Sequence, residues 1–207
     1  MSDQLVLQFS TVAPDWRRGT PPFCKRVPFH IMFDKNWASP WIRRVNHSPF
    51  SHVDFVLDDG SLLGASNSPN APFVRGNPCG VAVRPPDYED FSYRRRMILK
   101  TDRADDILSI AQTQIGKTFD NSGLIDFLSD HFPGVRDWRL DDSWFCAELA
   151  MWALDVGGLW QPFRVIWPKN RVSPTDIVLT LLMDQRFVNR ATFWEPVPGL
   201  TLGPNES

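Results

Sequence analysis

The stretch of residues 52–66 is the clearest β-hairpin in the sequence, and it constrains the fold more than any other feature. Residues 52–57 (His-Val-Asp-Phe-Val-Leu) and 61–66 (Ser-Leu-Leu-Gly-Ala-Ser) are rich in aliphatic side chains, which is typical of strands. The segment between them, Asp58-Asp59-Gly60, is a typical three-residue hairpin loop. Because an isolated hairpin is marginally stable in water, this one predicts a larger antiparallel sheet with a packed face.

Strand signals elsewhere dominate the first half of the chain, and helix signals follow. Apolar runs and alternation predict further strands over residues 5–9, 27–33, 80–84, 93–99 and 186–194. Caps and helical periodicity predict helices over residues 102–115, 122–128, 143–156 and 173–183. Asp102 is expected to cap the first of these helices, and Ser173, with Pro174 and an acidic Asp176, the last. The sum is an α+β fold, an antiparallel sheet with helices packed against it.

Composition indicates one ordinary globular domain. The chain has 207 residues, of which 43% are hydrophobic and 22% charged, so we expect a single domain over residues 1–207 with an extended tail at 196–207. The formal net charge of −2 gives no general attraction to nucleic acid, and the basic cluster at residues 94–96 is expected to be a solvated strand end. Three widely spaced cysteines form neither a disulfide framework nor a zinc-ligand pattern, so we expect no metal and no cofactor.

Targeting and membrane signals are not evident in the sequence. Residues 1–9 lack the basic region and the long apolar run of a signal peptide. No stretch approaches the ~18 apolar residues of a membrane span, so no transmembrane anchor is expected. The protein is therefore expected to be made in the cytoplasm, and a target outside the cytoplasm would require delivery by other means.

A cysteine at the start of an expected helix is the strongest candidate for chemistry. Ser143 or Asp142 is expected to cap this helix, and a cap at Ser143 would put Cys146 at the third helical position. There the partial positive charge of the helix N-terminus favours a thiolate over a thiol. The alternative is a buried and inert cysteine that serves only the core.

A cysteine nucleophile needs a base within hydrogen-bond reach. The chain offers four histidines, His30, His47, His52 and His131. His52 is the strongest candidate, because it opens the best-defined strand and would therefore be held rigidly. A histidine at a strand start that faces a cysteine at a helix start is the geometry that a thiol hydrolase requires.

Two stretches resemble parts of the papain-like, NlpC-type cysteine hydrolases. Residues 51–65 are similar to the histidine hairpin of that family, and residues 144–149 are similar to its nucleophile helix. In this chain His52 precedes Cys146. That order is typical of the circularly permuted branch, which includes bacterial and phage hydrolases and relatives of lecithin:retinol acyltransferase.

Two further stretches resemble the same branch. Residues 116–120 (Gly-Lys-Thr-Phe-Asp) are similar to its Gly-x-x-Tyr-Asp segment, and residues 172–176 (Val-Ser-Pro-Thr-Asp) to its Ser-Pro helix start. The resemblance covers roughly residues 46–180. It implies a permuted papain-like fold, in which the antiparallel sheet packs against the helix that carries the nucleophile.

The resemblance also implies an activity, hydrolysis of an amide bond through Cys146 and His52 by way of an acyl-enzyme. The bacterial and phage members imply a cell-wall (peptidoglycan) peptide as substrate, reached in the periplasm or wall by a phage tail component or an injected toxin. Two alternatives remain open. One is an acyl or thioester hydrolase or acyltransferase with the same site, and the other is a catalytically inactive structural or docking module of a virion.

Gly64 departs from the family pattern, because it stands where relatives usually carry the polar third member of the site. With a three-residue hairpin loop, the register puts Asp54 opposite Gly64 and on the same face as His52. The glycine leaves room for the carboxylate to reach the imidazole, so we expect Asp54 to be the orienting group. Ser66, which lies opposite His52 in this register, is the competing candidate.

Phe119 is a second departure, since relatives often have a tyrosine there whose hydroxyl helps to polarise the substrate carbonyl. Phenylalanine cannot donate a hydrogen bond, so the oxyanion is expected to rely on the backbone N–H of Cys146 and one further donor. Asp120 is expected to hold the loop rather than to react. Phe119, Asp120 and Trp144 are the residues expected to line the site.

Overall fold

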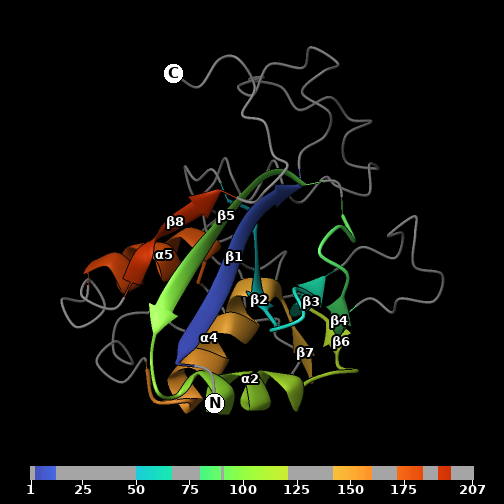
Figure 1. Cartoon of the computed structure of the whole chain (residues 1–207). Coiled ribbons are helices and arrows are strands. Elements are labelled where there is room, and N and C mark those ends of the chain that lie inside the picture. The colour runs from blue at the N-terminus through green and yellow to red at the C-terminus, as the bar shows by residue number, and fades with distance from the viewer. Residues whose placement is uncertain are drawn as a thin grey trace, which may run out of the picture.

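The computed structural model describes residues 3–12, 50–66, 80–89, 91–120, 142–159, 172–183 and 191–196. In this part of the chain a six-stranded antiparallel sheet has the strand order β4-β3-β2-β1-β5-β8 (Figure 1). Its strands are β1 (Gln4–Val12), β2 (His52–Val56), β3 (Leu62–Ser66), β4 (Gly80–Arg84), β5 (Phe91–Lys100) and β8 (Ala191–Pro196). The other elements are the helices α2 (Ala104–Gln112), α4 (Cys146–Val156) and α5 (Pro174–Met183) and a parallel pair, β6 (Thr118–Phe119) and β7 (Ser143–Trp144). The described residues therefore have the α+β arrangement that the sequence predicts.

Strand β1 lies at the centre of the sheet, between β2 and β5. Its alternate residues Leu5, Leu7 and Phe9 are fully buried and belong to the main core. On the opposite face Ser10 and Gln8 are paired in register with the first and third residues of β2. Since directly paired residues of antiparallel strands share a face, the sheet has one apolar face and one face that carries buried polar groups.

The β2–β3 hairpin has the expected register. Phe55 pairs with Leu63, and the Leu57 N–H donates to the Ser61 carbonyl oxygen at 2.9 Å. The loop turns at Gly60, whose φ of +83° is favourable for glycine. The predicted three-residue loop is thus confirmed, and with it the alignment of the two strands.

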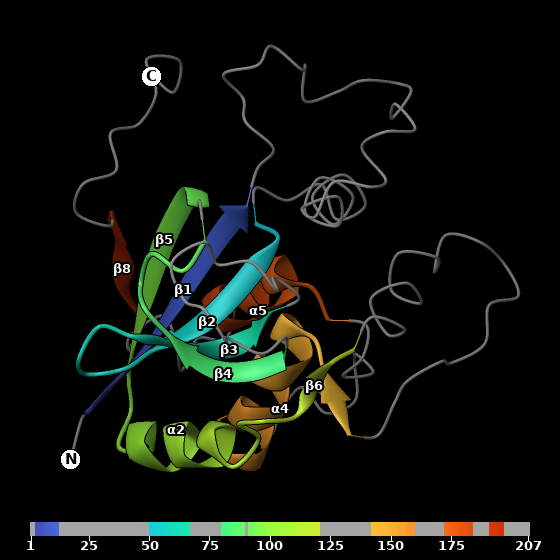
Figure 2. The same cartoon turned by 90° about the vertical axis from the view of Figure 1, so that its right-hand side faces the viewer.

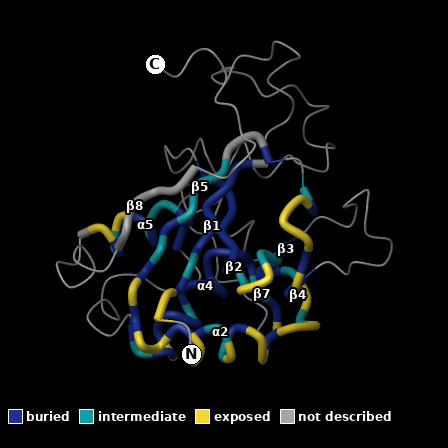
Figure 3. Tube along the Cα trace, in the orientation of Figure 1, coloured by how far each residue is buried: buried dark blue, intermediate teal, exposed yellow. Residues whose placement is uncertain are grey.

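Helices α4 and α5 lie against the apolar face of the sheet, and α2 lies at the end where β1 begins (Figure 2). Helices α2 and α4 approach each other closely at Gly157, the C-cap of α4. A Cβ on this glycine would lie 2.3 Å from a side-chain carbon of Ile107 in α2. Buried residues concentrate along α4 and the central strands, and exposed ones on α2 and the turns (Figure 3). The core joins side chains from the sheet and from helices α2, α4 and α5, among them Phe55, Leu63, Ile107, Leu149, Met151, Ile177 and Leu181.

The helix after β5 begins later than predicted. Its N-cap is Arg103, whose backbone N–H donates to the Thr101 hydroxyl at 3.2 Å. The predicted cap at Asp102 is therefore wrong, because the Thr101 side chain makes the bond that closes this turn. At the other end α2 stops at Gln112, and the chain turns before Gly116, where φ is +92°.

The start of α5 follows the prediction. The Ser173 hydroxyl accepts the Asp176 N–H at 3.1 Å, and the Asp176 carboxylate accepts the Ser173 N–H at 2.8 Å. Two backbone donors at the helix start are satisfied reciprocally, with Pro174 as the first helical residue. This capping box is confirmed.

Some predictions lie outside the described residues. They concern the strand at 27–33, the helix at 122–128, residues 186–190 of the last strand, and His30, His47 and His131. Of the tail expected at 196–207, residues 197–207 also lie outside, and Pro196 is not part of a tail because it is the last residue of β8. Among the helices that are described, none has both the length and the apolar character needed to cross a membrane.

Candidate active site

Cys146 is the first residue of α4, not the third. The N-cap is Phe145, in an extended conformation (φ −101°, ψ 164°), and no side chain caps the helix. The predicted caps Ser143 and Asp142 are wrong, because Ser143 pairs in a parallel bridge with Thr118 and its backbone must be extended. At this first position the backbone N–H of Cys146 is among those that a helix cannot satisfy internally.

Long-range contacts hold the start of α4 in place. The Val81 N–H on β4 donates to the Lys117 carbonyl oxygen at 2.9 Å, and the Asp120 N–H donates to the Trp144 carbonyl oxygen at 3.1 Å. The Trp144 indole N–H donates to the Gln114 side-chain oxygen at 3.1 Å. The segment that precedes Cys146 is therefore tied to β6, and through β6 to the edge of the sheet.

His52 and Asp54 lie on one face of β2, as the alternation of the strand predicts. The His52 Nε2 atom is 2.9 Å from the Asp54 Oδ1 atom. Both residues are buried, with 9% and 1% of their surface exposed. A Cβ on Gly64 would lie 2.0 Å from Asp54 Oδ1, so the glycine provides the space in which this carboxylate sits.

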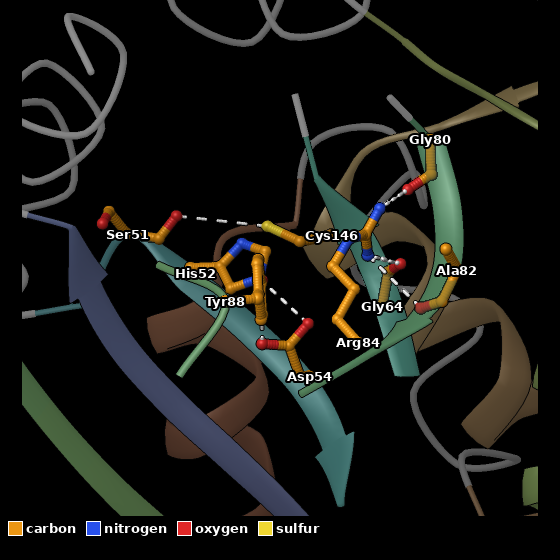
Figure 4. Close-up of polar contacts among 9 residues, drawn as sticks. All are labelled: Ser51, His52, Asp54, Gly64, Gly80, Ala82, Arg84, Tyr88 and Cys146. Carbon is orange, nitrogen blue, oxygen red and sulfur yellow. Dashed lines mark hydrogen bonds and ion pairs between the residues drawn. The ribbon is translucent and has the colours of Figure 1, made fainter. Parts of the chain in front are cut away.

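The thiol of Cys146 meets this pair at the start of β2. Its Sγ lies 4.0 Å from the Ser51 carbonyl oxygen, and Figure 4 shows the sulfur on the side of the imidazole away from Asp54. Burial acts to lower the pKa of His52, but the charges of Asp54 and Cys146 and their hydrogen bonds to the ring outweigh it. The pKa of His52 is therefore raised well above its ordinary value of 6.5, and the site favours an imidazolium.

Tyr88 joins the site, although sequence reasoning did not single it out. Its hydroxyl oxygen is 2.8 Å from His52 Nε2 and 3.3 Å from Asp54 Oδ2 (Figure 4). Only 2% of the residue is exposed. Burial and the negative charge of Asp54 raise the pKa of Tyr88 well above its ordinary value of 10.0, so the hydroxyl keeps its proton. Tyr88 follows a Pro-Pro-Asp turn, and nothing in that local pattern predicts a contact with β2.

A buried arginine lies next to Tyr88. Arg84 donates to the carbonyl oxygens of Gly64 at 2.8 Å, Gly80 at 2.6 Å and Ala82 at 3.3 Å. Its guanidinium carbon lies 5.3 Å from the centre of the Tyr88 ring.

The remaining predicted site residues are buried or half-buried. Ser66 is buried on β3 and pairs with Gly80 of β4. Phe119 and Trp144 pair across β6 and β7 and pack against the main core. Asp120 is buried beside them.

In the described part of the chain, no group of three or more His, Cys, Asp and Glu side chains is arranged to hold a metal ion. A scan against protein-family models and searches of curated proteins and of solved structures found no match to the chain.

Proposed function

We propose that the chain is a cysteine hydrolase of the permuted papain-like type, with Cys146 as nucleophile, His52 as base and Asp54 as the group that orients the base. The observation that carries the proposal is the placement of a helix-start cysteine beside a buried histidine whose Nε2 is held 2.9 Å from a buried carboxylate. Buried charges are costly unless they are paired, so such a cluster is uncommon in a core that serves stability alone.

The contacts of the two ring nitrogens of His52 determine which of them can act as the base. Since Nε2 faces Asp54 and Tyr88, Nδ1 is the ring nitrogen that remains for the thiol. His52 takes the proton of Cys146, and the thiolate attacks the substrate carbonyl carbon. The resulting oxyanion is stabilised by backbone N–H groups, of which that of Cys146 at the helix start is one.

The second half of the reaction returns the enzyme to its initial state. The imidazolium of His52 gives its proton to the leaving amine, and the carbon–nitrogen bond breaks to leave a thioester on Cys146. Water, deprotonated by the neutral His52, then attacks this thioester. The carbon–sulfur bond breaks, the acid product leaves, and Cys146 recovers its proton.

The substrate class comes from the resemblance of residues 51–65, 116–120, 144–149 and 172–176 to the bacterial and phage branch of the family. On that basis we propose an amide bond in a bacterial cell-wall peptide, reached in the periplasm or wall by a phage tail component or an injected toxin. The absence of the usual polar residue at Gly64 does not weaken the proposal, because Asp54 occupies the space that the glycine leaves.

The first test is the alkylation rate of Cys146 by iodoacetamide as a function of pH, measured by peptide mass spectrometry in wild type and His52→Ala. We expect fast alkylation well below pH ~8.5, where a free thiol ionises, and loss of that reactivity in His52→Ala. Cys24 and Cys79, measured in the same digests, provide internal comparison. A Cys146 that reacts like a free thiol regardless of His52 would exclude a catalytic pair.

A second test separates substrate classes. Purified peptidoglycan, a model thioester and a model ester are incubated with wild type and with Cys146→Ser, and new amino and carboxyl groups are quantified. Release of amines from peptidoglycan by the wild type alone supports the amidase. Cleavage of only the thioester or ester would favour the acyl-transfer alternative, and no turnover by a reactive Cys146 would favour a structural module.

A further inference from the structure

The hydrogen bonds around His52 Nε2 allow one arrangement of protons. An ionised carboxylate only accepts hydrogen bonds, so Nε2, at 2.9 Å from Asp54 Oδ1, must carry a hydrogen. A phenol has one proton to donate. The single Nε2 hydrogen is shared between Asp54 Oδ1 and the Tyr88 oxygen, which lies 2.8 Å from Nε2, and the Tyr88 hydroxyl gives its own proton to Asp54 Oδ2 at 3.3 Å. Both carboxylate oxygens are then satisfied, and the lone pair of a neutral His52 is on Nδ1.

We propose that Tyr88 is a positioning residue of the reaction, which holds Asp54 by its second oxygen and keeps neutral His52 in the Nε2–H tautomer. This inference rests on the proposed hydrolase function of Cys146, because its consequence is that Nδ1 stays free to take the thiol proton. Tyr88, in the turn after β4, thereby contributes a hydroxyl to the polar network around His52. Gly64, on β3, has no side chain to contribute.

The ring of Tyr88 is fixed on several sides, as a positioning role requires. It meets the Phe91 ring edge to face, with centroids 5.3 Å apart, and Phe91 in turn stacks on the His52 ring at 6.3 Å. The Arg84 guanidinium lies 5.3 Å from the centre of the Tyr88 ring and is itself bonded to three backbone carbonyls. The hydroxyl therefore has little freedom to leave Asp54 and His52.

The charged and titratable groups that act on Tyr88 come from several elements. They are Asp54 and His52 on β2, Cys146 at the start of α4, Arg84 at the end of β4 and Glu89 in the turn that follows. Together these groups keep the phenol protonated, since burial and the surrounding negative charges outweigh Arg84. A protonated phenol is what the donor role toward Asp54 needs.

The test compares wild type with Tyr88→Phe, which removes the hydroxyl and keeps the ring. The pKa and tautomer of His52 are measured from ¹⁵N shifts of labelled histidine, and the alkylation of Cys146 is measured against pH. We expect the pKa of His52 to fall in Tyr88→Phe and alkylation at neutral pH to slow roughly tenfold to a hundredfold, as for the loss of a hydrogen bond to a charged group. Tyr93→Phe, the same change at the other tyrosine of the chain, is the matched control and is expected to leave both unchanged.

An unchanged pKa and alkylation profile in Tyr88→Phe, with only a lower melting temperature, would overturn the proposal and leave Tyr88 a packing residue. The tautomer of wild type gives a test that needs no variant, because a neutral His52 with its proton on Nδ1 also overturns it. Repeating the titration in Cys146→Ala separates the two proposals. If Cys146 proves unreactive in wild type, the hydrolase fails, yet a Tyr88-dependent pKa of His52 in that background still supports the network.

Discussion

Gly64 affects the site through the side chain of Asp54 on the neighbouring strand β2. A Cβ at this position would lie 2.0 Å from Oδ1 of Asp54, which is closer than atoms tolerate, and 3.1 Å from Cγ, which is a tight contact. Asp54 Oδ1 is the atom that faces His52 Nε2. A side chain at position 64 must therefore displace the Asp54 carboxylate from the His52 imidazole, or strand β3 must move away from β2.

We therefore expect Gly64→Ala to slow the alkylation of Cys146 at neutral pH about tenfold or more, because His52 loses a charge-assisted hydrogen bond. Two variants in the same hairpin serve as controls. Gly60→Ala, with φ +83° and open space around the new Cβ, should lower stability by about 1 kcal/mol without changing alkylation. Ser66→Ala should also keep the wild-type profile. A normal profile in Gly64→Ala would mean that Asp54 does not orient the base.

At the scale of elements, the edge of the sheet positions the nucleophile. Gly80 opens β4 with φ +123°, and a Cβ there would lie 2.1 Å from the Lys117 carbonyl oxygen. That same oxygen accepts the Val81 N–H at 2.9 Å, and the segment after it pairs with the residues that lead into Cys146. The distance between Cys146 and His52 therefore depends on how closely β4 and β6 approach.

Gly80→Ala is expected to lower the free energy of unfolding by about 2 kcal/mol or more, through backbone strain and steric overlap, and also to slow alkylation of Cys146. Urea unfolding and the alkylation assay measure the two effects. Ser173→Ala removes the cap of α5 and should cost about 1 kcal/mol with no change in alkylation. If both variants slowed alkylation in proportion to their loss of stability, β4 would have no specific part in placing Cys146.

Local signals account for what the sequence predicts correctly. The hairpin register and the Ser173–Asp176 capping box depend on residues close in the chain, and strand alternation suffices to put His52 and Asp54 on one face. The start of α4 was predicted wrongly because a bridge to β6 keeps Ser143 extended. Tyr88 was missed because it reaches His52 from 36 positions away, across a turn whose path local sequence does not specify.

At the scale of the whole molecule, the site links stability to pH. The pKa of folded His52 lies well above 6.5, its ordinary value, so the folded protein holds this proton more tightly than the unfolded chain does. The stabilisation is fully present below pH ~6.5 and is lost as pH rises through the pKa of the folded state. The unfolding free energy should therefore fall with increasing pH in the neutral to alkaline range.

This fall is expected to be at most about 1.4 kcal/mol per pH unit, the limit for one proton. Urea unfolding of Cys146→Ala over this pH range measures the part of the fall that depends on Asp54, because the thiol that also raises the pKa of His52 is removed. Adding His52→Ala to that background should flatten the dependence, whereas adding His47→Ala should leave it as it was. The range stops short of pH ~10, where tyrosines in the unfolded chain begin to ionise. Equal slopes with and without His52 would show that Asp54 alone does not hold the imidazole as a cation.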